Sequence, residues 1–170
     1  MIFYFSGTGN SLHVAREISN YLGDKLIFIP DEISRSETTL NYDIKDGDYL
    51  GFVFPVHAWG PPMIVLEFIN RLDLAGHIPY VFSVVTCGEE EGKTTDILRR
   101  SLEKKSLPLS SAFTLVMPNS YILSYDVESE EVIYSKLLSA DEKIKDICKI
   151  LENREVNRYQ IISGSFAYPK

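Results

Sequence analysis

The feature that most constrains the fold of this chain is a glycine-rich turn between an apolar strand and a helix at its N-terminus. Residues 2–5 form an apolar run that predicts a buried strand. Gly7 and Gly9 follow, interleaved with small polar residues, and from Ser11 onward apolar residues recur at helical spacing. This order places a helix N-terminus, with its unbonded amides and partial positive charge, beside a backbone that a ligand can approach closely. It therefore predicts a binding site for an anion.

The chemistry of this loop favours a phosphate that stays bound over one that is transferred. The loop contains no Lys or Arg, and it lacks the Gly-Lys-Ser/Thr ending that P-loops use to hold nucleoside triphosphates. It also lacks the third glycine of the dinucleotide-binding fingerprint. A plain capping turn is the alternative interpretation. The predicted phosphate ligands are Ser6, Gly7, Thr8, Gly9, Asn10 and Ser11.

The rest of the chain alternates predicted strands with predicted helices. Further strands are expected at residues 26–29, 49–54, 80–85 and 113–116. Helices are expected at about 61–72, 97–102 and 130–151, and the polar stretch 31–48 is expected to be an irregular, solvated connection. This order predicts an α/β fold with a five-stranded, parallel, doubly wound sheet. Ligands of such sheets bind beyond the carboxyl ends of the strands, at the switch point.

The loop after the third predicted strand has the composition of a ring-binding loop. It consists of Pro55, Val56, His57, Ala58, Trp59 and Gly60, and it contains the only tryptophan of the chain. A flat indole beside a phosphate site suits stacking on an aromatic ring system, although a tryptophan that fills the end of the core is the alternative. The His57 side chain can donate to a ligand or be satisfied by nearby backbone.

The loop after the fourth predicted strand supplies a second set of candidate residues. These are Thr86, Cys87, Gly88, Glu89 and Gly92. The run Glu89–Glu91 would place negative charge at the rim of a bound ring and make its reduction harder, or it would be a solvated acidic loop that caps the next helix. Cys87 has no evident base beside it and is expected to be a small loop residue, not a nucleophile.

These motifs together resemble the flavodoxin family. The segment Ser6–Ser11 is similar to the hydroxyl-x-Thr-Gly-x-hydroxyl pattern that holds the FMN phosphate there, and Cys87-Gly88-Glu89 looks like the second wall of the isoalloxazine site. A Met-Pro segment that contains Tyr121 extends the resemblance to the flavodoxin-like domain of bacterial and archaeal flavodoxin–ferredoxin fusion proteins. The resemblance implies a three-layer α/β/α fold with strand order 2-1-3-4-5 and one non-covalently bound FMN. Tyr121 joins the residues named above as an expected FMN contact.

Composition limits the function classes and the domain organisation. The formal net charge of −7 argues against nucleic acid as a partner. No basic leader or membrane-length apolar run is present, so no membrane association is expected and the cytoplasm is the expected location. Two distant cysteines cannot build the iron–sulfur clusters of the fusion proteins. Residues 1–153 are expected to form the FMN domain, and 154–170 a tail that could begin a linker to a ferredoxin domain.

The resemblance implies an electron-transport role. A flavoprotein of this type would exchange electrons through bound FMN with a ferredoxin-type or other redox protein, and no acid–base residue would be needed. The alternative is an FMN-dependent NAD(P)H:quinone-type oxidoreductase on the same fold. A signalling receiver domain is excluded, because Ser6-Gly7 and Pro55-Val56 stand where its acidic residues would be needed.

Overall fold

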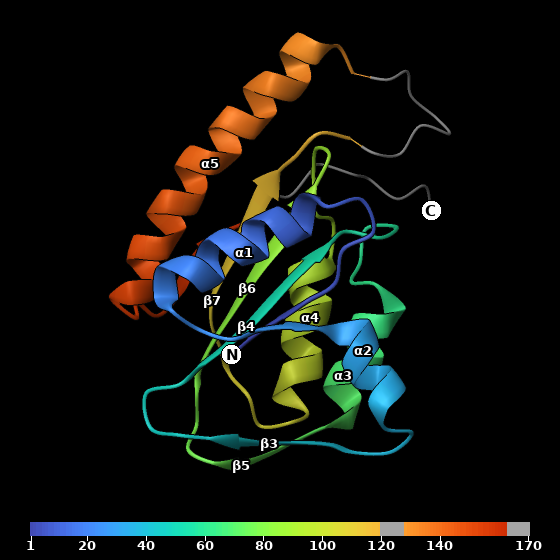
Figure 1. Ribbon diagram of the computed structural model, residues 1–170, viewed down its shortest axis with the longest axis vertical. Coiled ribbons are helices and arrows are strands. Elements are labelled where there is room, and N and C mark those ends of the chain that lie inside the picture. The colour runs from blue at the N-terminus through green and yellow to red at the C-terminus, as the bar shows by residue number, and fades with distance from the viewer. Residues whose placement is uncertain (120–127, 163–170) are drawn as a thin grey trace.

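A six-stranded parallel sheet lies at the centre of the molecule (Figure 1), whose computed structural model describes residues 1–119 and 128–162. From one edge to the other, the strands are β2 (Leu26–Phe28), β1 (Ile2–Tyr4), β4 (Tyr49–Pro55), β6 (Tyr80–Cys87), β7 (Leu109–Val116) and β8 (Arg158–Gln160). Every neighbouring pair is parallel. The first five strands have the expected order 2-1-3-4-5, so the predicted fold class is confirmed.

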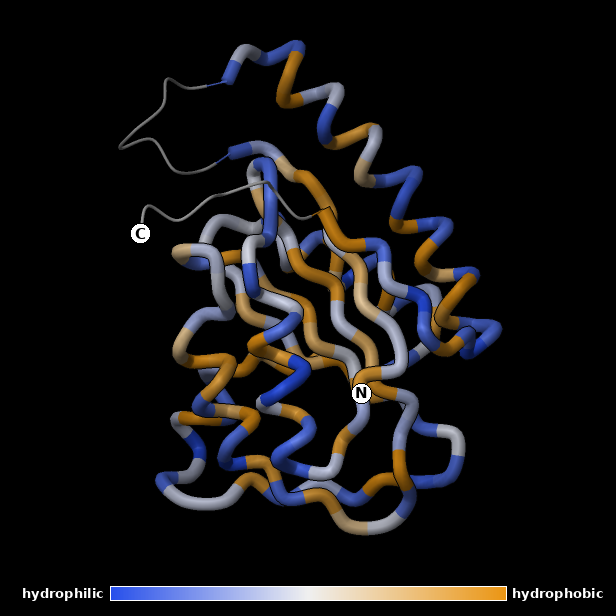
Figure 2. Tube along the Cα trace, turned by 180° about the vertical axis from the view of Figure 1, so that it is seen from behind, coloured by the Kyte–Doolittle hydropathy of each residue, from blue (hydrophilic) through white to orange (hydrophobic). Residues whose placement is uncertain are grey.

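Helices cover both faces of this sheet and bury two separate cores. The helices α1 (Asn10–Leu22) and α5 (Glu130–Glu152) lie on one face. The helices α2 (Ile29–Arg35), α3 (Met63–Arg71) and α4 (Thr94–Glu103) lie on the other. Figure 2 shows hydrophobic residues concentrated along the central strands, whereas hydrophobic and hydrophilic residues alternate along α5. The architecture is therefore the three-layer α/β/α arrangement.

The central strands are continuous apolar runs because both of their faces are covered. All eight residues of β6 are buried, as are the five central residues of β4. Gly51 is required within β4, since a Cβ atom there would lie 2.4 Å from the Phe82 ring of β6. The close approach of this ring fixes the packing between the two strands that carry the loops described below.

The sheet has one strand more than the sequence indicated. β8 pairs with β7 and lies within residues 154–170, which were expected to form only a tail. All three residues of β8 are exposed. A strand without a buried face has no hydrophobic alternation, and for this reason the sequence did not predict it.

The stretch that was expected to be irregular contributes one strand of a second, two-stranded sheet. The strand β3 (Leu40–Ile44) pairs in parallel with β5 (Leu72–Gly76), and α2 occupies residues 29–35. The expectation of a solvated connection over residues 31–48 is therefore wrong. Leu40 and Ile44 are buried, and they alternate with polar residues as in a half-buried strand.

The last helix extends past the sheet. The buried residues of α5 begin only at Ala140, and its N-terminal half projects away from the sheet in Figure 1.

None of the helices in the two described ranges combines the length and the apolar character that a membrane span requires.

Candidate functional site

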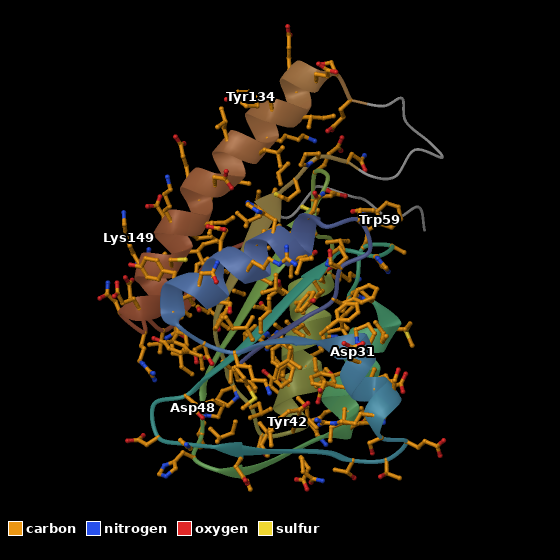
Figure 3. The ribbon with its side chains drawn as sticks, viewed as in Figure 1. Asp31, Tyr42, Asp48, Trp59, Tyr134 and Lys149 are labelled. Atoms are coloured by element: carbon orange, nitrogen blue, oxygen red, sulfur yellow. The ribbon has the colours of Figure 1, made fainter. Side chains whose placement is uncertain are left out.

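Four loops meet at the carboxyl edge of the sheet, after β1, β4, β6 and β7. They surround a pocket of about 120 Å³. Its lining consists of Ser6, Gly7, Thr8, Asn10, Ser11, Pro55, Val56, Thr86, Cys87, Gly88, Met117, Pro118 and Asn119. Figure 3 shows Trp59 at this end of the molecule and Asp48 and Tyr42 at the opposite end. The pocket thus lies where parallel α/β sheets bind their ligands.

The loop after β1 presents a set of unused backbone donors. Gly9 caps α1 with a φ of 101°, which an L-residue rarely adopts, and its amide donates to Ser6 Oγ at 3.2 Å. The first turn of α1 contains no acidic residue. Within the described chain, no hydrogen-bond partner is present for the amides of Gly7, Thr8, Asn10, Ser11 and Leu12. This donor set, at the positive end of a helix, suits a phosphate.

Two predicted phosphate ligands use their side chains to join the loops. The Ser11 and Thr86 hydroxyl oxygens lie 2.7 Å apart, and both residues are buried. Asn10 Nδ2 donates to the Pro118 carbonyl oxygen at 3.0 Å. The start of α1 is therefore fixed to the end of β6 and to the loop after β7, which positions its free amides.

The loop after β4 is a tight turn with an unusual backbone. His57 and Gly60 exchange two backbone hydrogen bonds, of 2.9 and 3.0 Å. The two residues between them, Ala58 and Trp59, have φ angles of 47° and 59°. Each left-handed non-glycine residue costs about 1–2 kcal/mol. The turn holds the Trp59 side chain 45% exposed, so this tryptophan does not fill the end of the core.

Trp59 links this turn to the loop after β6. Its Nε1 donates to Glu90 Oε1 at 3.1 Å, and its carbonyl oxygen accepts from the Lys93 amide at 3.0 Å. Gly92 has a φ of 62°, and a Cβ atom on it would lie 2.5 Å from the Trp59 Cβ. Only glycine permits this contact, and the two loops therefore form one packed unit.

The three consecutive glutamates have three different environments. Glu89 is exposed, and Glu90 accepts from Trp59. Glu91 is 2% exposed and accepts from Thr95 Oγ1 at 2.9 Å and from Thr114 Oγ1 at 2.7 Å. The alternative of a solvated acidic loop is therefore wrong for Glu91, whose side chain is buried. Its carboxylate joins the start of α4 to β7 and is satisfied by hydroxyl donors.

Cys87 lines the pocket as a neutral thiol. Burial, and then the negative charge of Glu91, raise its pKa to about 12. A thiol that stays protonated at neutral pH is a poor nucleophile. Its place in the pocket is that of a small, uncharged residue.

The structure adds pocket and supporting residues that were not selected from the sequence. Met117, Pro118 and Asn119 line the pocket after β7, a position that the sheet-edge rule could have identified. Lys136 of α5 donates to the Gly88 carbonyl oxygen at 3.1 Å and pairs with Glu128. Glu128 in turn accepts from the Asn119 amide at 3.1 Å. The sequence offers no sign of the contact between Lys136 and Gly88, because 48 positions separate the two residues.

The other residues selected from the sequence do not line the pocket. These are Gly9, His57, Ala58, Trp59, Gly60, Glu89 and Gly92. Gly9 shapes the loop after β1, and the others lie in the packed unit of Trp59 and the β6 loop. The His57 ring packs edge-on against Phe5, with 5.8 Å between ring centroids. Tyr121 lies outside the described residues.

Comparison with known proteins identifies the fold. No protein-family model and no curated protein matches the sequence. Among solved structures, the Trp repressor binding protein from Bacillus subtilis matches with a TM-score of 0.57 and 11% identity, over 88% of this chain and 96% of its own. A protein from Bacteroides uniformis that has been assigned as a flavoprotein matches with a TM-score of 0.52 and 17% identity, over 81% and 96%.

A third structure matches only through part of its length. Rubredoxin oxygen:oxidoreductase from Desulfovibrio gigas has a TM-score of 0.52 and 14% identity, over 90% of this chain and 36% of its own. At such identities the likeness establishes the fold alone. The chain therefore has a flavodoxin-like α/β fold, with a loop of unused backbone amides at its switch point.

Proposed function

We propose that this protein binds FMN by its phosphate at the start of α1 and exchanges electrons with a redox partner protein. The observation that carries the proposal is the set of unused amides at the positive end of α1, in a loop without a carboxylate. A ligand that supplies a phosphate would satisfy these donors.

The pocket is large enough for only part of the cofactor. A volume of about 120 Å³ accommodates a phosphate, whereas sites that enclose a whole drug-sized ligand have about 300–1,000 Å³. The residues present therefore fit the phosphate end of FMN, with the remainder outside the pocket. The neighbouring packed unit of Trp59 and the β6 loop offers an exposed aromatic face there.

The residues that line the pocket bind and orient the phosphate, and they do not transfer protons in the reaction. When bound, the flavin supplies the ability to accept and release electrons. Among the described lining residues, Cys87 is the one that titrates, and its pKa of about 12 keeps it neutral. The amides and the α1 dipole offset the phosphate charge, and Ser11 and Thr86 fix the donors in place. The pocket lining thus holds the phosphate end of the cofactor and takes no part in proton transfer.

The names of two of the structural neighbours agree with a role in flavin binding or in redox chemistry. One is assigned as a flavoprotein and another is an oxygen:oxidoreductase of rubredoxin. An open ring site also suits exchange with a protein, since electron-transfer contacts are small and transient.

The test is ligand binding by the cofactor-free protein. FMN and riboflavin are titrated separately and binding is followed by quenching of flavin fluorescence. We expect FMN to bind at least about tenfold more tightly, because hydrogen bonds to a charged group are worth about 1.5–3 kcal/mol each. Thr8→Ala should weaken FMN but not riboflavin, whereas Thr39→Ala, at an exposed threonine before β3, should change neither. Equal affinities for the two flavins would overturn the phosphate assignment.

A second measurement separates a carrier from an enzyme. The FMN-loaded protein should show negligible turnover of NAD(P)H with a quinone in the absence of another protein. Rapid turnover would favour the quinone-type oxidoreductase instead.

A further inference from the structure

A groove larger than the pocket runs between α3 and α4. It has a volume of about 400 Å³, and the two helices lie side by side in Figure 1. Its lining consists of Leu66, Asn70, Ile97, Arg100, Ser101, Lys104 and Lys105. The apolar members stand toward the start of each helix, and the basic members stand at the end of α4 and just beyond it.

This groove is basic in an acidic protein. Residues 93–105 contain five Lys or Arg and two Asp or Glu, a net charge of +3 in a chain of net charge −7. Arg99 pairs with both acidic residues, with N–O distances of 3.4 Å to Asp96 and 2.9 Å to Glu103. Neither Arg100 nor Lys104 has an ion-pair partner within residues 1–119 and 128–162. Two cations are thus available to an external acidic group.

The groove is continuous with the candidate site for the flavin ring, which is the exposed face beside Trp59. A Cβ atom on Gly60, the neighbour of Trp59, would lie 3.5 Å from Ile97 Cδ1. Met63 at the start of α3 is 79% exposed, and Leu66 follows it on the same helical face. We call this surface the α3–α4 strip, defined by Trp59, Met63, Leu66, Ile97, Arg100 and Lys104. It begins with apolar side chains beside the ring site and ends with unpaired cations.

We propose that the α3–α4 strip is the docking surface for an acidic redox protein. This inference rests on the proposed function, because it assigns the partner of the same flavin site. Apolar contacts surrounded by charged groups are the usual anatomy of a protein interface. A partner with carboxylates opposite Arg100 and Lys104 would be held with its redox centre next to Trp59, at the open side of the pocket.

The charge distribution also favours this groove as the docking surface over the loop that contains Glu89–Glu91. Glu91 is buried, and Glu90 is engaged by Trp59, which leaves Glu89 as the exposed carboxylate of that loop. The groove itself is lined by three basic residues, Arg100, Lys104 and Lys105, and by no acidic one, and this arrangement orients an acidic partner toward one face.

The experiment measures electron transfer to the FMN-loaded protein from an acidic [2Fe–2S] ferredoxin that has been reduced with dithionite and freed of excess reductant. Stopped-flow absorbance is recorded at several salt concentrations. The test variant is Arg100→Glu/Lys104→Glu, with Arg100→Gln/Lys104→Gln as a milder second variant. The control is Lys143→Glu/Lys145→Glu, which makes the same charge change at exposed positions of α5, on the other face of the sheet.

We expect the test variant to slow the reaction at least about tenfold at low salt and to reduce its salt dependence, because steering by local charge sets such rates. The milder variant should slow the reaction less. The control should change the rate by less than about twofold, apart from the effect of its altered net charge. Equal slowing by the test variant and the control would overturn the proposal, as would an unchanged or faster rate. Competition by ATP at constant ionic strength would show a small-anion site instead and would also overturn it.

Binding is measured independently of the flavin. Fluorescence anisotropy of labelled ferredoxin is titrated with the chain, with and without FMN. If the test variant loses ferredoxin binding and the control does not, the α3–α4 strip is supported, whether or not the chain binds FMN. A chain that binds ferredoxin through the strip but does not bind FMN would reject only the proposed function. If the chain binds FMN normally but the test variant binds ferredoxin as well as the parent protein does, the docking surface is rejected and the proposed function stands.

Discussion

The hydroxyl oxygens of Ser11 and Thr86 lie 2.7 Å apart and join the first turn of α1 to the end of β6. Both residues are buried and both line the pocket. Each hydroxyl has one hydrogen, and a single hydrogen bond between them uses only one of the two. The other hydrogen is available to a ligand, so this pair both braces the site and contributes a donor to it.

Removal of either hydroxyl should therefore weaken FMN binding. We predict that Ser11→Ala and Thr86→Val each lower the affinity by about 1–3 kcal/mol, because each change removes the brace between α1 and β6 and one hydroxyl from the pocket. The double variant should lose less than the sum of the two, since the residues act as a pair. Fluorescence titration of the three variants measures this coupling. Strictly additive losses would show that the two hydroxyls act independently.

Trp59 should contribute to flavin binding through its exposed aromatic face. We predict that Trp59→Ala weakens FMN binding by on the order of 1 kcal/mol and increases the residual flavin emission, because stacking quenches it. Trp59→Phe keeps an aromatic ring but loses the donor to Glu90. Its FMN affinity should lie between those of the parent protein and Trp59→Ala. Tyr134→Ala removes a 65% exposed aromatic residue from α5 and serves as the control. Unchanged FMN affinity in Trp59→Ala would place this side chain outside the ring site.

The backbone of the Trp59 turn should be a source of strain that glycine relieves. Ala58 has a φ of 47°, so we predict that Ala58→Gly raises the free energy of unfolding by about 1 kcal/mol. Urea denaturation measures the change. The matched variant Ala75→Gly, in β5, should lower the free energy of unfolding by about 0.5–1 kcal/mol, because glycine weakens a strand interior. A loss of stability in Ala58→Gly would mean that the turn is not strained at this residue.

The two thiols should be inert in the folded protein and should make it sensitive to alkali. Burial raises the pKa of Cys87 to about 12 and that of Cys148 to about 11, from an ordinary value of 9.0. Below pH 9 both states keep these protons. Above pH 9 the unfolded chain releases them and the folded chain does not, so the free energy of unfolding falls as the pH rises toward 11–12.

Two measurements check the thiols. Iodoacetamide at pH 8 should modify the protein only after unfolding, and rapid modification of the native state would contradict the raised pKa values. Urea denaturation at pH 8, 9 and 10 should show a smaller loss of stability in Cys87→Ala/Cys148→Ala than in the parent protein.

The sequence predicts the parts of the fold that bury apolar residues in regular patterns. β4 and β6 are continuous apolar runs, and their order between turns and helices predicts a parallel sheet. The turn between β1 and α1 is visible because glycines and polar residues interrupt that pattern. β8 was missed because Arg158–Gln160 are exposed, and β3 was missed because its two buried residues lie among polar neighbours.

The details of the site depend on contacts that the sequence does not contain. A run of three glutamates is ordinarily solvated, and a buried Glu91 becomes favourable through the hydroxyl donors of Thr95 and of the distant Thr114 on β7. Lys136 reaches Gly88 across 48 residues of chain. The sheet-edge rule located the pocket loops after β1, β4 and β6, whereas the loop after β7 entered only through the family resemblance. The direction of each side chain was set by tertiary packing.

β8 also determines how the sheet meets other molecules. β7 is eight residues long, and as an outermost strand it would present unpaired N–H and C=O groups on which another chain could assemble. β8 pairs with Ser111, Ala112 and Phe113 of β7. It is three residues long and exposed throughout, and short polar strands are poor templates for further strand addition. This short strand therefore covers three residues of the β7 edge and offers little edge of its own for the addition of another strand.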